Sequence, residues 1–461
     1  MIKDFGYEEP SKISELSTIV MTSFAFGQTL TAVSWGRFSD KYGRKPALMI
    51  GSFGTLVMTV FFGLSRNIYM AIAARLCCGL LNGNVGVMRT MVAEIVGNRR
   101  EHQTRAFALL PMAMNIGTIV GPIIGGMLAN PVEQFPGLFK DNRLFAAFPY
   151  LLPNLVPVPM SLASVCLIAL FIKETGDSRH TVLRVETDPM LKMGNALKSW
   201  FIRAEAEKSE TEDEEEPLLQ NQQDDEESAT EDSSAESDAY EHASLRSILT
   251  KPVRVTLVCH VLLMLHCPAF MQLLPLLLAT PRIEQEWRNA VVFNGGLGLP
   301  TSRIGVIIAI LAIMSIVLQI AVYPTVATKL GNALTHRMAL FAFPIGYTLI
   351  PYLSFLPKDN DNLAIIASTI LSSLCVVGRT FAIPPMTVLM TNASPSRKVL
   401  GTVHGLTHSA TSAARCVGPF LLGNIYSLGV KVGIIGLAWW IMSLTAIIEI
   451  FSAVQLKEWG Q

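Results

Sequence analysis

Eleven runs of about twenty or more largely apolar residues constrain the fold of this chain more than any other feature. An α-helix rises 1.5 Å per residue and the hydrocarbon core of a bilayer is about 30 Å thick, so one crossing needs roughly 20 such residues. Backbone polar groups in lipid must pair within the protein, which favours helices. The sequence therefore predicts an all-α polytopic membrane protein. Its predicted spans are residues 16–36, 46–64, 68–96, 104–129, 149–172, 252–279, 303–323, 337–356, 362–390, 399–426 and 431–455.

The composition agrees with a surface that faces lipid. Of the 461 residues, 51% are hydrophobic and 16% are charged, whereas soluble domains carry about 25% charged residues. Lys plus Arg and Asp plus Glu number 36 each, and the basic residues occur singly or in pairs between apolar runs. Binding of nucleic acid is therefore not expected. The seven cysteines all lie in apolar runs, where we expect them to pack as small hydrophobes.

One long polar segment, residues 173–251, interrupts the apolar runs. Its middle is rich in Glu, Asp and Ser, so it cannot bury enough apolar surface to offset the entropy lost on ordering. We therefore expect a disordered linker here. We place it in the cytosol, because two short loops on the same side of the membrane are rich in basic residues, as cytosolic loops usually are. The linker separates an N-terminal half, 1–172, from a C-terminal half, 252–461.

The linker also contains the spacing of an acidic dileucine sorting signal. Glu214 precedes the pair Leu218 and Leu219 by four residues. Such a signal binds a sorting adaptor and would direct the protein to an endosomal or vacuolar membrane. The same spacing arises readily in acidic loops, so the plasma membrane stays open as an alternative.

Landmarks recur between the two halves at similar offsets. A loop glycine occurs at Gly43 and again 288 residues later, an intramembrane Arg at Arg75 and 304 residues later, and a Gly-Pro pair at Gly121 and 297 residues later. Near-constant offsets predict a duplicated half, as in transporters built from internal repeats. The counterparts are Gly331, Arg379 and the pair Gly418 and Pro419.

The loop from Gly36 to Pro46, between the first two predicted spans, is the most specific motif. It places Gly36, Asp40, Gly43 and Arg44 at the spacing G-x-x-x-D-x-x-G-R. An Asp at a helix start caps free N–H groups, and glycine permits a tight turn. The spacing closely resembles the loop between helices two and three of the major facilitator superfamily. The resemblance implies that Asp40 and Arg44 belong to a charge network that latches the two halves in one state.

Two glycine patterns support the same resemblance. Arg75 is followed by glycines at helical spacings, which let another helix approach closely and place a charge within the membrane; this pattern resembles the family's fourth-helix Arg motif. The second pattern resembles the fifth-helix motif of the drug:proton antiporter branch, and it also predicts a close-packed, Pro-kinked helix interface. Its residues are Gly117, Gly121, Pro122, Gly125 and Gly126.

The amino-acid sequences of several loops narrow the resemblance to one group. Asn130-Pro131, Glu133 to Phe139, Phe148 to Leu155 and Gly401 to Leu406 are similar to the plant and fungal zinc-induced-facilitator-like group. Members export varied cargo with proton coupling, so the group does not fix a substrate. Twelve spans are the family norm, and the first run here leads directly into the Asp40 loop. We therefore expect the family's first helix, which often holds a proton-carrying acid, to be missing.

Ionisable residues inside predicted spans are candidates for the transport pathway, because such residues are costly in lipid. Arg75, Arg379, His260 and His266 are the cavity or coupling candidates. His404 and His408 lie four apart on one helix face and are weak candidates for a zinc site. With no third ligand nearby in sequence, packing or interface hydrogen bonds are the favoured interpretation for both.

The predicted function is secondary active transport, in which a monomer exports a small molecule or ion in exchange for protons by alternating access. No P-loop, nucleophile motif, paired acids or metal box accompanies the spans, so an enzyme or an ATP-driven pump is not expected and no cofactor is implied. Two alternatives stay open: a transporter-derived membrane sensor, and a truncated transporter without activity.

Overall fold

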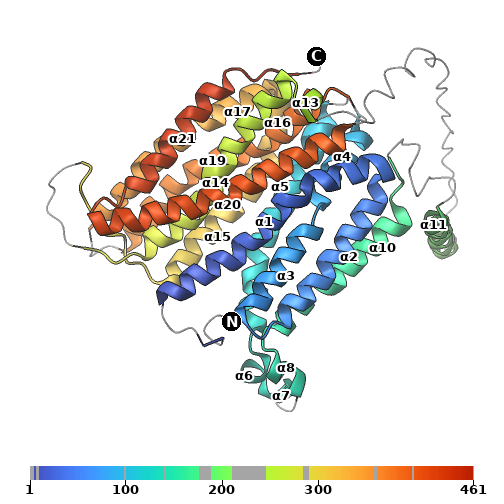
Figure 1. Ribbon diagram of the computed structural model, residues 1–461, viewed down its shortest axis with the longest axis horizontal. Coiled ribbons are helices and arrows are strands. Elements are labelled where there is room, and N and C mark those ends of the chain that lie inside the picture. Colours follow the sequence, from blue (N-terminus) through green and yellow to red (C-terminus); the bar gives the residue numbers. More distant parts are fainter. Residues whose placement is uncertain are drawn as a thin grey trace.

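The structure, a computed structural model, describes residues 5–6, 10–97, 100–139, 142–175, 188–209, 245–283, 290–357, 361–396 and 399–459. Helices make up nearly all regular structure in these ranges, and the long ones lie side by side in one bundle (Figure 1). The all-α architecture expected from the apolar runs is confirmed.

Helices of the N-terminal half pack around α3, which contacts both α1 and α2, while α10 covers the other side of α2. Four short helices, α6 to α9, lie between α5 and α10; three of them, α6 to α8, project from one end of the bundle (Figure 1). The bounds are α1 Pro10–Tyr42, α2 Arg44–Gly63, α3 Ile68–Leu81, α4 Asn84–Val96, α5 Arg100–Leu128, α6 Pro131–Gln134, α7 Pro136–Phe139, α8 Arg143–Ala147, α9 Leu151–Leu155 and α10 Pro157–Phe171.

The C-terminal half contains the largest buried apolar cluster, in which α14, α19 and α21 contribute most side chains. Its second and third runs are segmented by changes in helix type, a π-helical turn at η2 and a 3₁₀ turn at η3. The bounds are α14 Lys251–Ala279, α15 Thr301–Val317, η2 Leu318–Val322, α16 Tyr323–Leu330, α17 Asn332–Leu340, α18 Ala342–Leu349, η3 Ile350–Phe355, α19 Asp361–Ala393, α20 Leu400–Val432 and α21 Leu437–Ala453.

Every predicted span coincides with a helix or a short series of helices. Within the described residues, seven of these segments are long and apolar enough to cross a membrane, and Leu437–Ala453 is apolar but shorter. Helices α1 and α20 are less apolar because they face each other across the contact between the halves, where α20 buries Thr402, Thr407 and Thr411. The seven segments are Arg44–Gly63, Ile68–Val96, Leu151–Phe171, Lys251–Ala279, Arg303–Leu330, Asn332–Phe355 and Asn362–Ala393.

The contact between α1 and α20 forms the seam that joins the two halves. Backbones approach closely there because glycines face each other: a Cβ on Gly36 would overlap the carbonyl of Gly401, and one on Gly405 would lie 2.5 Å from the carbonyl of Ala32. Small residues permit this approach between membrane helices. In Figure 1, α1 crosses the bundle directly beside α20.

The predicted span 68–96 is broken into α3 and α4 at Asn82 and Gly83. The break frees the carbonyl of Leu80, which accepts hydrogen bonds from Trp35 Nε1 at 2.9 Å and Thr31 Oγ1 at 2.8 Å. Irregular backbone in a membrane protein is tolerated where neighbouring side chains pair the freed groups. Helix α1 therefore stabilises the break.

Two helices lie within the segment expected to be a disordered linker. Residues Pro189–Ser209 form α11, which packs on α10, and Leu245–Ile248 form the short α13. The predicted disorder thus does not extend over 188–209, because the acidic run begins only after α11 and Asp188 caps that helix. The sorting candidates Glu214, Leu218 and Leu219 lie outside the described residues.

Two loop glycines singled out as repeat landmarks have the same backbone geometry. Gly43 joins α1 to α2 with φ 110° and ψ 159°, and Gly331 joins α16 to α17 with φ 82° and ψ 162°. After each glycine, a carboxylate accepts hydrogen bonds from backbone N–H groups. Glu174 accepts from Arg44 and Lys45, and Glu458 accepts from Ala333. Only glycine adopts such positive φ angles readily.

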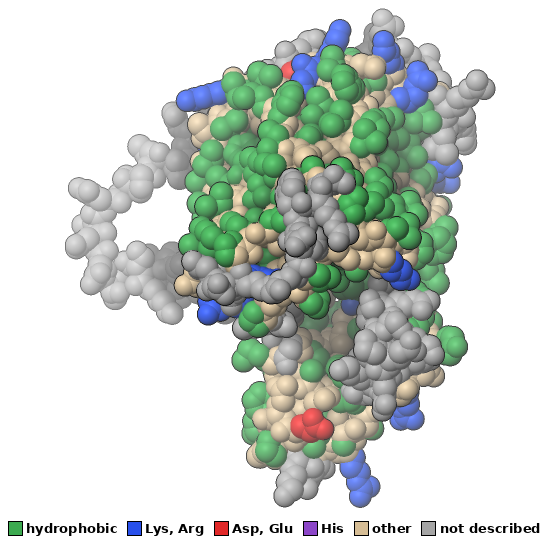
Figure 2. Space-filling view, turned by 90° about the vertical axis from the view of Figure 1, so that its left-hand side faces the viewer, with side chains coloured by type: hydrophobic (Ala, Val, Ile, Leu, Met, Phe, Trp, Pro, Cys, Tyr) green, Lys and Arg blue, Asp and Glu red, His purple; other side chains and the backbone are tan. Residues whose placement is uncertain are grey.

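The outer surface of the bundle is apolar. Figure 2 shows one face on which hydrophobic side chains predominate, with Lys and Arg mainly around its margins. Large side chains such as Ile370 and Phe451 are 66% and 71% exposed. Exposed apolar surface of this extent fits contact with lipid rather than water.

Candidate functional site

Asp40, in the last turn of α1, connects the two halves at one end of the seam, which we call the Asp40 end. Its carboxylate accepts hydrogen bonds from the backbone N–H of Gly401 at 2.9 Å and of Thr402 at 2.6 Å, and from Thr402 Oγ1 at 2.6 Å. These groups belong to the first turn of α20, whose free N–H groups and helix dipole favour a negative charge. Asp40 thus caps a helix of the opposite half.

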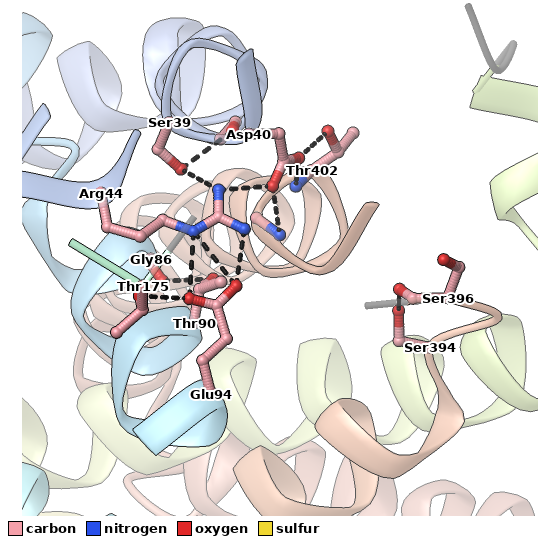
Figure 3. Close-up of polar contacts among 12 residues, drawn as sticks. Ser39, Asp40, Arg44, Gly86, Thr90, Glu94, Thr175, Ser394, Ser396 and Thr402 are labelled. Atoms are coloured by element: carbon pink, nitrogen blue, oxygen red, sulfur yellow. Dashed lines mark hydrogen bonds and ion pairs between the residues drawn. The ribbon is translucent and has the colours of Figure 1, made fainter. Parts of the chain in front are cut away.

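Arg44 lies between two carboxylates and holds both in place (Figure 3). Its guanidinium donates to Asp40 at 2.7 Å and to Glu94, at the end of α4, at 2.8 Å. The Arg44 side chain is 3% exposed, so both ion pairs are shielded from water and are stronger than surface pairs. Glu94 is therefore paired with Arg44, the first residue of α2.

A third ion pair, made by the neighbouring Lys45, fixes the start of α11. Lys45 Nζ donates to Asp188, and both side chains are buried. Asp188 also accepts from the backbone N–H of Met190 and Leu191, which makes it the N-cap of α11. Burial raises the pKa of the Asp188 carboxyl, but Lys45 and the two N–H donors lower it by more, so that its pKa lies below the ordinary value. This pair was not anticipated from the sequence, because its partners are 143 residues apart.

A second group of ionisable residues lies entirely inside the C-terminal half. Glu449 on α21 and His266 on α14 are fully buried, with Glu449 Oε2 2.8 Å from His266 Nε2. The other ring nitrogen, His266 Nδ1, lies 2.9 Å from the Tyr347 hydroxyl. His336 Nε2 on α17 lies 3.6 Å from Glu449 Oε1, beyond hydrogen-bond distance. We call Glu449, His266, Tyr347 and His336 the Glu449 cluster.

This cluster accommodates either protonation state of its central imidazole. Both ring nitrogens of His266 have a partner, Glu449 at Nε2 and Tyr347 at Nδ1, and the tautomer of the neutral ring decides which atoms donate. A charged ring donates from both nitrogens, so neither contact is lost. A buried carboxyl and imidazole arranged in this way can take up and release a proton.

The two arginines paired by the repeat have different surroundings. Arg379 on α19 interacts with Cys267 and Tyr347, so it lies beside the Glu449 cluster. Arg75 on α3 instead places its guanidinium 4.4 Å from the ring centre of Phe62 on α2. The structure therefore brings Arg379 and His266 together and leaves Arg75 apart from them.

A third group of side chains gathers at the seam, from α4, α14 and α20. The charges of Arg89 and Arg415 interact, and those of both act on His260 and His408. His404 belongs to the same group, because it interacts with His260 and Arg89. We call Arg89, Arg415, His260, His404 and His408 the basic seam cluster. His260 also interacts with His336 and so lies between this cluster and the Glu449 cluster.

The metal candidates His404 and His408 both lie near Arg89, and His408 also lies near Arg415. His404 Nε2 lies 3.2 Å from Thr391 Oγ1, a hydrogen bond within the bundle. The described residues contain no group of three or more His, Cys, Asp and Glu side chains able to hold a metal ion. Two guanidinium groups next to these imidazoles also repel a cation.

The two Gly-Pro motifs differ in packing. A Cβ on Gly418 in α20 would overlap the carbonyl of Leu265 in α14, so the backbones of these helices are in close contact beside Pro419. Among the described residues, no atom lies within 4 Å of a Cβ placed on Gly117, Gly121 or Gly125. The close interface at these three glycines stays a prediction. The motif residues Pro122 and Gly126 lie on the same helix, α5.

Several residues of the three groups were missed or not ranked by sequence reasoning. Arg89 lies on the same apolar run as Arg75, one turn after Gly86, and this spacing could have singled it out. His336 lies just outside the predicted span 337–356, whereas α17 buries it completely. Tyr347, Glu174 and Asp188 carried no local signal, since their partners come from distant parts of the chain.

Comparisons with known proteins agree with this architecture. The family model described as Major Facilitator Superfamily matches residues 1–419. The multidrug transporter mfsB of Aspergillus fumigatus is 34% identical over 98% of this chain and 78% of its own length. ZINC INDUCED FACILITATOR 1 of Arabidopsis thaliana is 28% identical over 93% of this chain and 79% of its own length.

A solved structure shows the same fold. The proton:xylose symporter XylE matches with a TM-score of 0.62 and 11% identity, over 96% of this chain and 86% of that chain. The resemblance noted in the Asp40 loop and in the sequences of other loops is thereby confirmed at the level of the whole chain. This integral, multi-pass membrane protein is a secondary transporter and not an enzyme, and it belongs to the Major Facilitator Superfamily.

Proposed function

We propose that this transporter couples movement of a small solute to protons and exports it by alternating access of the two halves. The observation that carries proton coupling is the Glu449 cluster, in which a fully buried carboxyl lies 2.8 Å from an imidazole. Ionisable groups inside a membrane protein mark proton relays. The resemblance of the segment from Gly117 to Gly126 to an antiporter motif favours export in exchange for protons.

The Asp40 contact supports alternating access. Asp40 on the N-terminal half binds the first turn of α20 on the C-terminal half, so the halves cannot separate at this end while the contact persists. We place this end in the cytosol, following the basic residues of the adjoining loops. Breaking the contact opens the protein inward; forming it closes that side. Gly36, Asp40, Gly43 and Arg44 are thus proposed to form the cytosolic latch.

The proposed organisation has two halves, 1–172 and 252–461, joined by the acidic segment 173–251 on the cytosolic side. Names of relatives indicate solutes of several kinds: mfsB is a multidrug transporter and XylE carries xylose with a proton. The partners proposed for this chain are a small solute, protons and the surrounding lipid, with the monomer as the transporting unit and a sorting adaptor at the acidic segment.

The test is a flux assay on the purified full chain in liposomes loaded with a pH-sensitive dye. Citrate, tetraphenylphosphonium and xylose are added in turn as an anionic, a cationic and a neutral probe. We expect at least one probe to drive proton movement that protein-free liposomes do not show. In Glu449→Gln, proton-driven accumulation of that probe should fall by about tenfold or more, while exchange of labelled for unlabelled probe continues.

Glu133→Gln serves as the matched control, because Glu133 is an exposed acid in the short helix α6. It should leave both accumulation and exchange unchanged. Accumulation by Glu449→Gln at the level of the unmodified chain would contradict the proposed role of Glu449. Probe movement that ignores the pH gradient would contradict proton coupling itself.

A further inference from the structure

The basic seam cluster contains buried nitrogen atoms that lack partners. In the described part of the chain, no hydrogen bond reaches Arg89 Nε, Arg415 Nε, His260 Nδ1, His404 Nδ1 or His408 Nε2. The three imidazoles are at most 2% exposed. An unpaired buried donor costs free energy, and native structures usually satisfy such groups. Five unpaired nitrogens on three helices, two of which pack on the third, therefore indicate a place for a bound group.

The hydrogen bonds of Arg415 fix the orientation of its guanidinium group but leave its Nε without a partner among the residues described. Arg415 Nη2 donates to Gln28 Oε1 at 3.1 Å and to Ser412 Oγ at 2.8 Å. Gln28 lies on α1 and Ser412 on α20, so the guanidinium is held exactly where the two halves meet. Both acceptors are neutral, and the Arg415 charge thus has no counterion from either.

The charge of the cluster decides the sign of the ligand. The charge acting on Arg89 is that of Arg415, and within the described ranges no carboxylate offsets either of them. Nearby acids are already engaged: Asp40 and Glu94 bind Arg44, and Glu449 binds His266. Two like charges in a buried setting repel each other. A ligand with negative charge relieves this repulsion, whereas a metal ion or an organic cation increases it.

We propose that the basic seam cluster is the binding site for a small anion that carries carboxylate or phosphate groups. Arg89 and Arg415 bind the anionic oxygens through their guanidinium groups, whose planar arrays of donors match carboxylate and phosphate. His260, His404 and His408 donate further hydrogen bonds. The inference rests on the proposed transport function and names its substrate class.

The position of the cluster connects the anion to the movement of the halves. Arg89 belongs to the N-terminal half, whereas the other four members belong to the C-terminal half. An anion bound by Arg89 and Arg415 together therefore links the halves across the seam. His404 lies two residues after Thr402, which Asp40 binds, so the proposed anion site and the Asp40 contact share one turn of α20. Binding and latch opening thus act on the same part of α20.

The test is equilibrium binding to the purified full chain in nanodiscs, which needs no transport. Radiolabelled citrate, inorganic phosphate and tetraphenylphosphonium are the three probes, so that a carboxylate, a phosphate and a cation are compared directly. We expect at least one anion to bind and the cation to compete with neither. In Arg415→Gln the Kd of the bound anion should rise about tenfold or more, as expected for loss of a charge-assisted hydrogen bond.

Two further variants separate binding from folding. Arg415→Lys retains the charge and should weaken binding less than Arg415→Gln; a site for anions predicts this order, whereas general loss of structure does not. Arg66→Gln is the matched control, because Arg66 is exposed and its guanidinium lies 4.8 Å from the ring centre of Phe148, away from the seam. Its Kd should equal that of the unmodified chain.

Three results overturn the inference: neither anion binds, the cation displaces a bound anion, or Arg415→Gln and Arg66→Gln have the same Kd. Failure of the proposed function is a different result. A chain that binds citrate in an Arg415-dependent way but moves no probe in liposomes keeps the anion site and contradicts transport. A chain that couples probe movement to protons with no effect of Arg415 contradicts the site alone.

Discussion

At the scale of single residues, Asp40 combines two roles that are usually separate. It pairs with Arg44 on its own half and caps α20 on the other half, with four hydrogen bonds in all at 2.6 to 2.9 Å. A neutral cap would satisfy the N–H groups of α20 but would not bind Arg44 as strongly. The negative charge of Asp40 therefore joins Arg44 of the N-terminal half to the first turn of α20 in the C-terminal half.

Asp40→Asn should weaken that closure. The amide keeps one acceptor oxygen but turns an NH₂ group toward donors. Each hydrogen bond to the charged carboxylate that is lost is worth about 1.5–3 kcal/mol. We expect the ratio of closed to open molecules to fall by roughly tenfold or more. Hydrogen–deuterium exchange of the Gly401 and Thr402 amides measures this ratio, with Glu133→Gln as the control that should exchange like the unmodified chain. Unchanged exchange in Asp40→Asn would refute the latch.

Gly401→Ala tests the same contact by its size. The added Cβ would overlap Asp40 Oδ1 and lie 2.9 Å from Ser39 Oγ, and overpacking of this kind costs about 1–3 kcal/mol. Thermal unfolding in nanodiscs should therefore begin at a lower temperature. Gly305→Ala is the matched control, because Gly305 lies in α15 and a Cβ there meets nothing within 4 Å. Equal melting temperatures for the two variants would show that the seam is looser than described.

At the scale of elements, sequence reasoning succeeded for helices and failed for their contacts, for a physical reason. Whether a run of residues enters a membrane depends on its own composition, so the predicted spans coincide with helices. The partner of a buried side chain depends on which helices become neighbours. His336 is an example: its sequence neighbours Thr335 and Arg337 indicate a loop, yet α17 places it against Glu449. The break at Gly83 likewise requires Trp35 and Thr31 of another helix.

Attachment of α11 to the bundle should depend on pH. The pKa of Asp188 is lowered in the folded protein, so its contribution to stability is present above the ordinary Asp pKa of about 4 and is lost as the pH falls through the lower folded-state value. Exchange protection of the Met190 and Leu191 amides, corrected for intrinsic rates, should therefore be constant from pH 7 to about 5 and decrease below about 4.

Asp188→Asn provides the comparison for this pH dependence. The variant lacks the carboxylate at every pH, so protection of the same two amides should be low at pH 7 and nearly independent of pH. Lys45→Met should also reduce protection at pH 7, because Asp188 would be left buried without its cation. Protection that increases as the pH falls would exclude the assigned role of Asp188.

At the scale of the whole molecule, the three groups of charged residues form a connected series. The Asp40 contact closes one end of the seam, the basic seam cluster lies along the same α20, and His260 interacts with both that cluster and His336. His336 in turn lies 3.6 Å from Glu449. In the proposed mechanism, solute, proton and closure therefore influence one another through neighbouring side chains, which coupled transport requires.

Alternating access makes a prediction that only the intact chain can test. If the halves separate at the Asp40 end in each cycle, a covalent link there must stop transport. Asp40→Cys combined with Thr402→Cys places two thiols where Asp40 Oδ2 and Thr402 Oγ1 are 2.6 Å apart. Oxidation should abolish the proton flux that a transported probe drives in liposomes, and a reducing agent should restore it.

The single variants Asp40→Cys and Thr402→Cys are the controls for this cross-link. The chain already has seven cysteines, and oxidation that acted through any of them would inhibit the single variants as well. Only the double variant should respond, because only it joins α1 to α20. Flux that continues in a fully cross-linked chain would mean that the seam stays closed at this end throughout the cycle, and transport would then require movement elsewhere in the bundle.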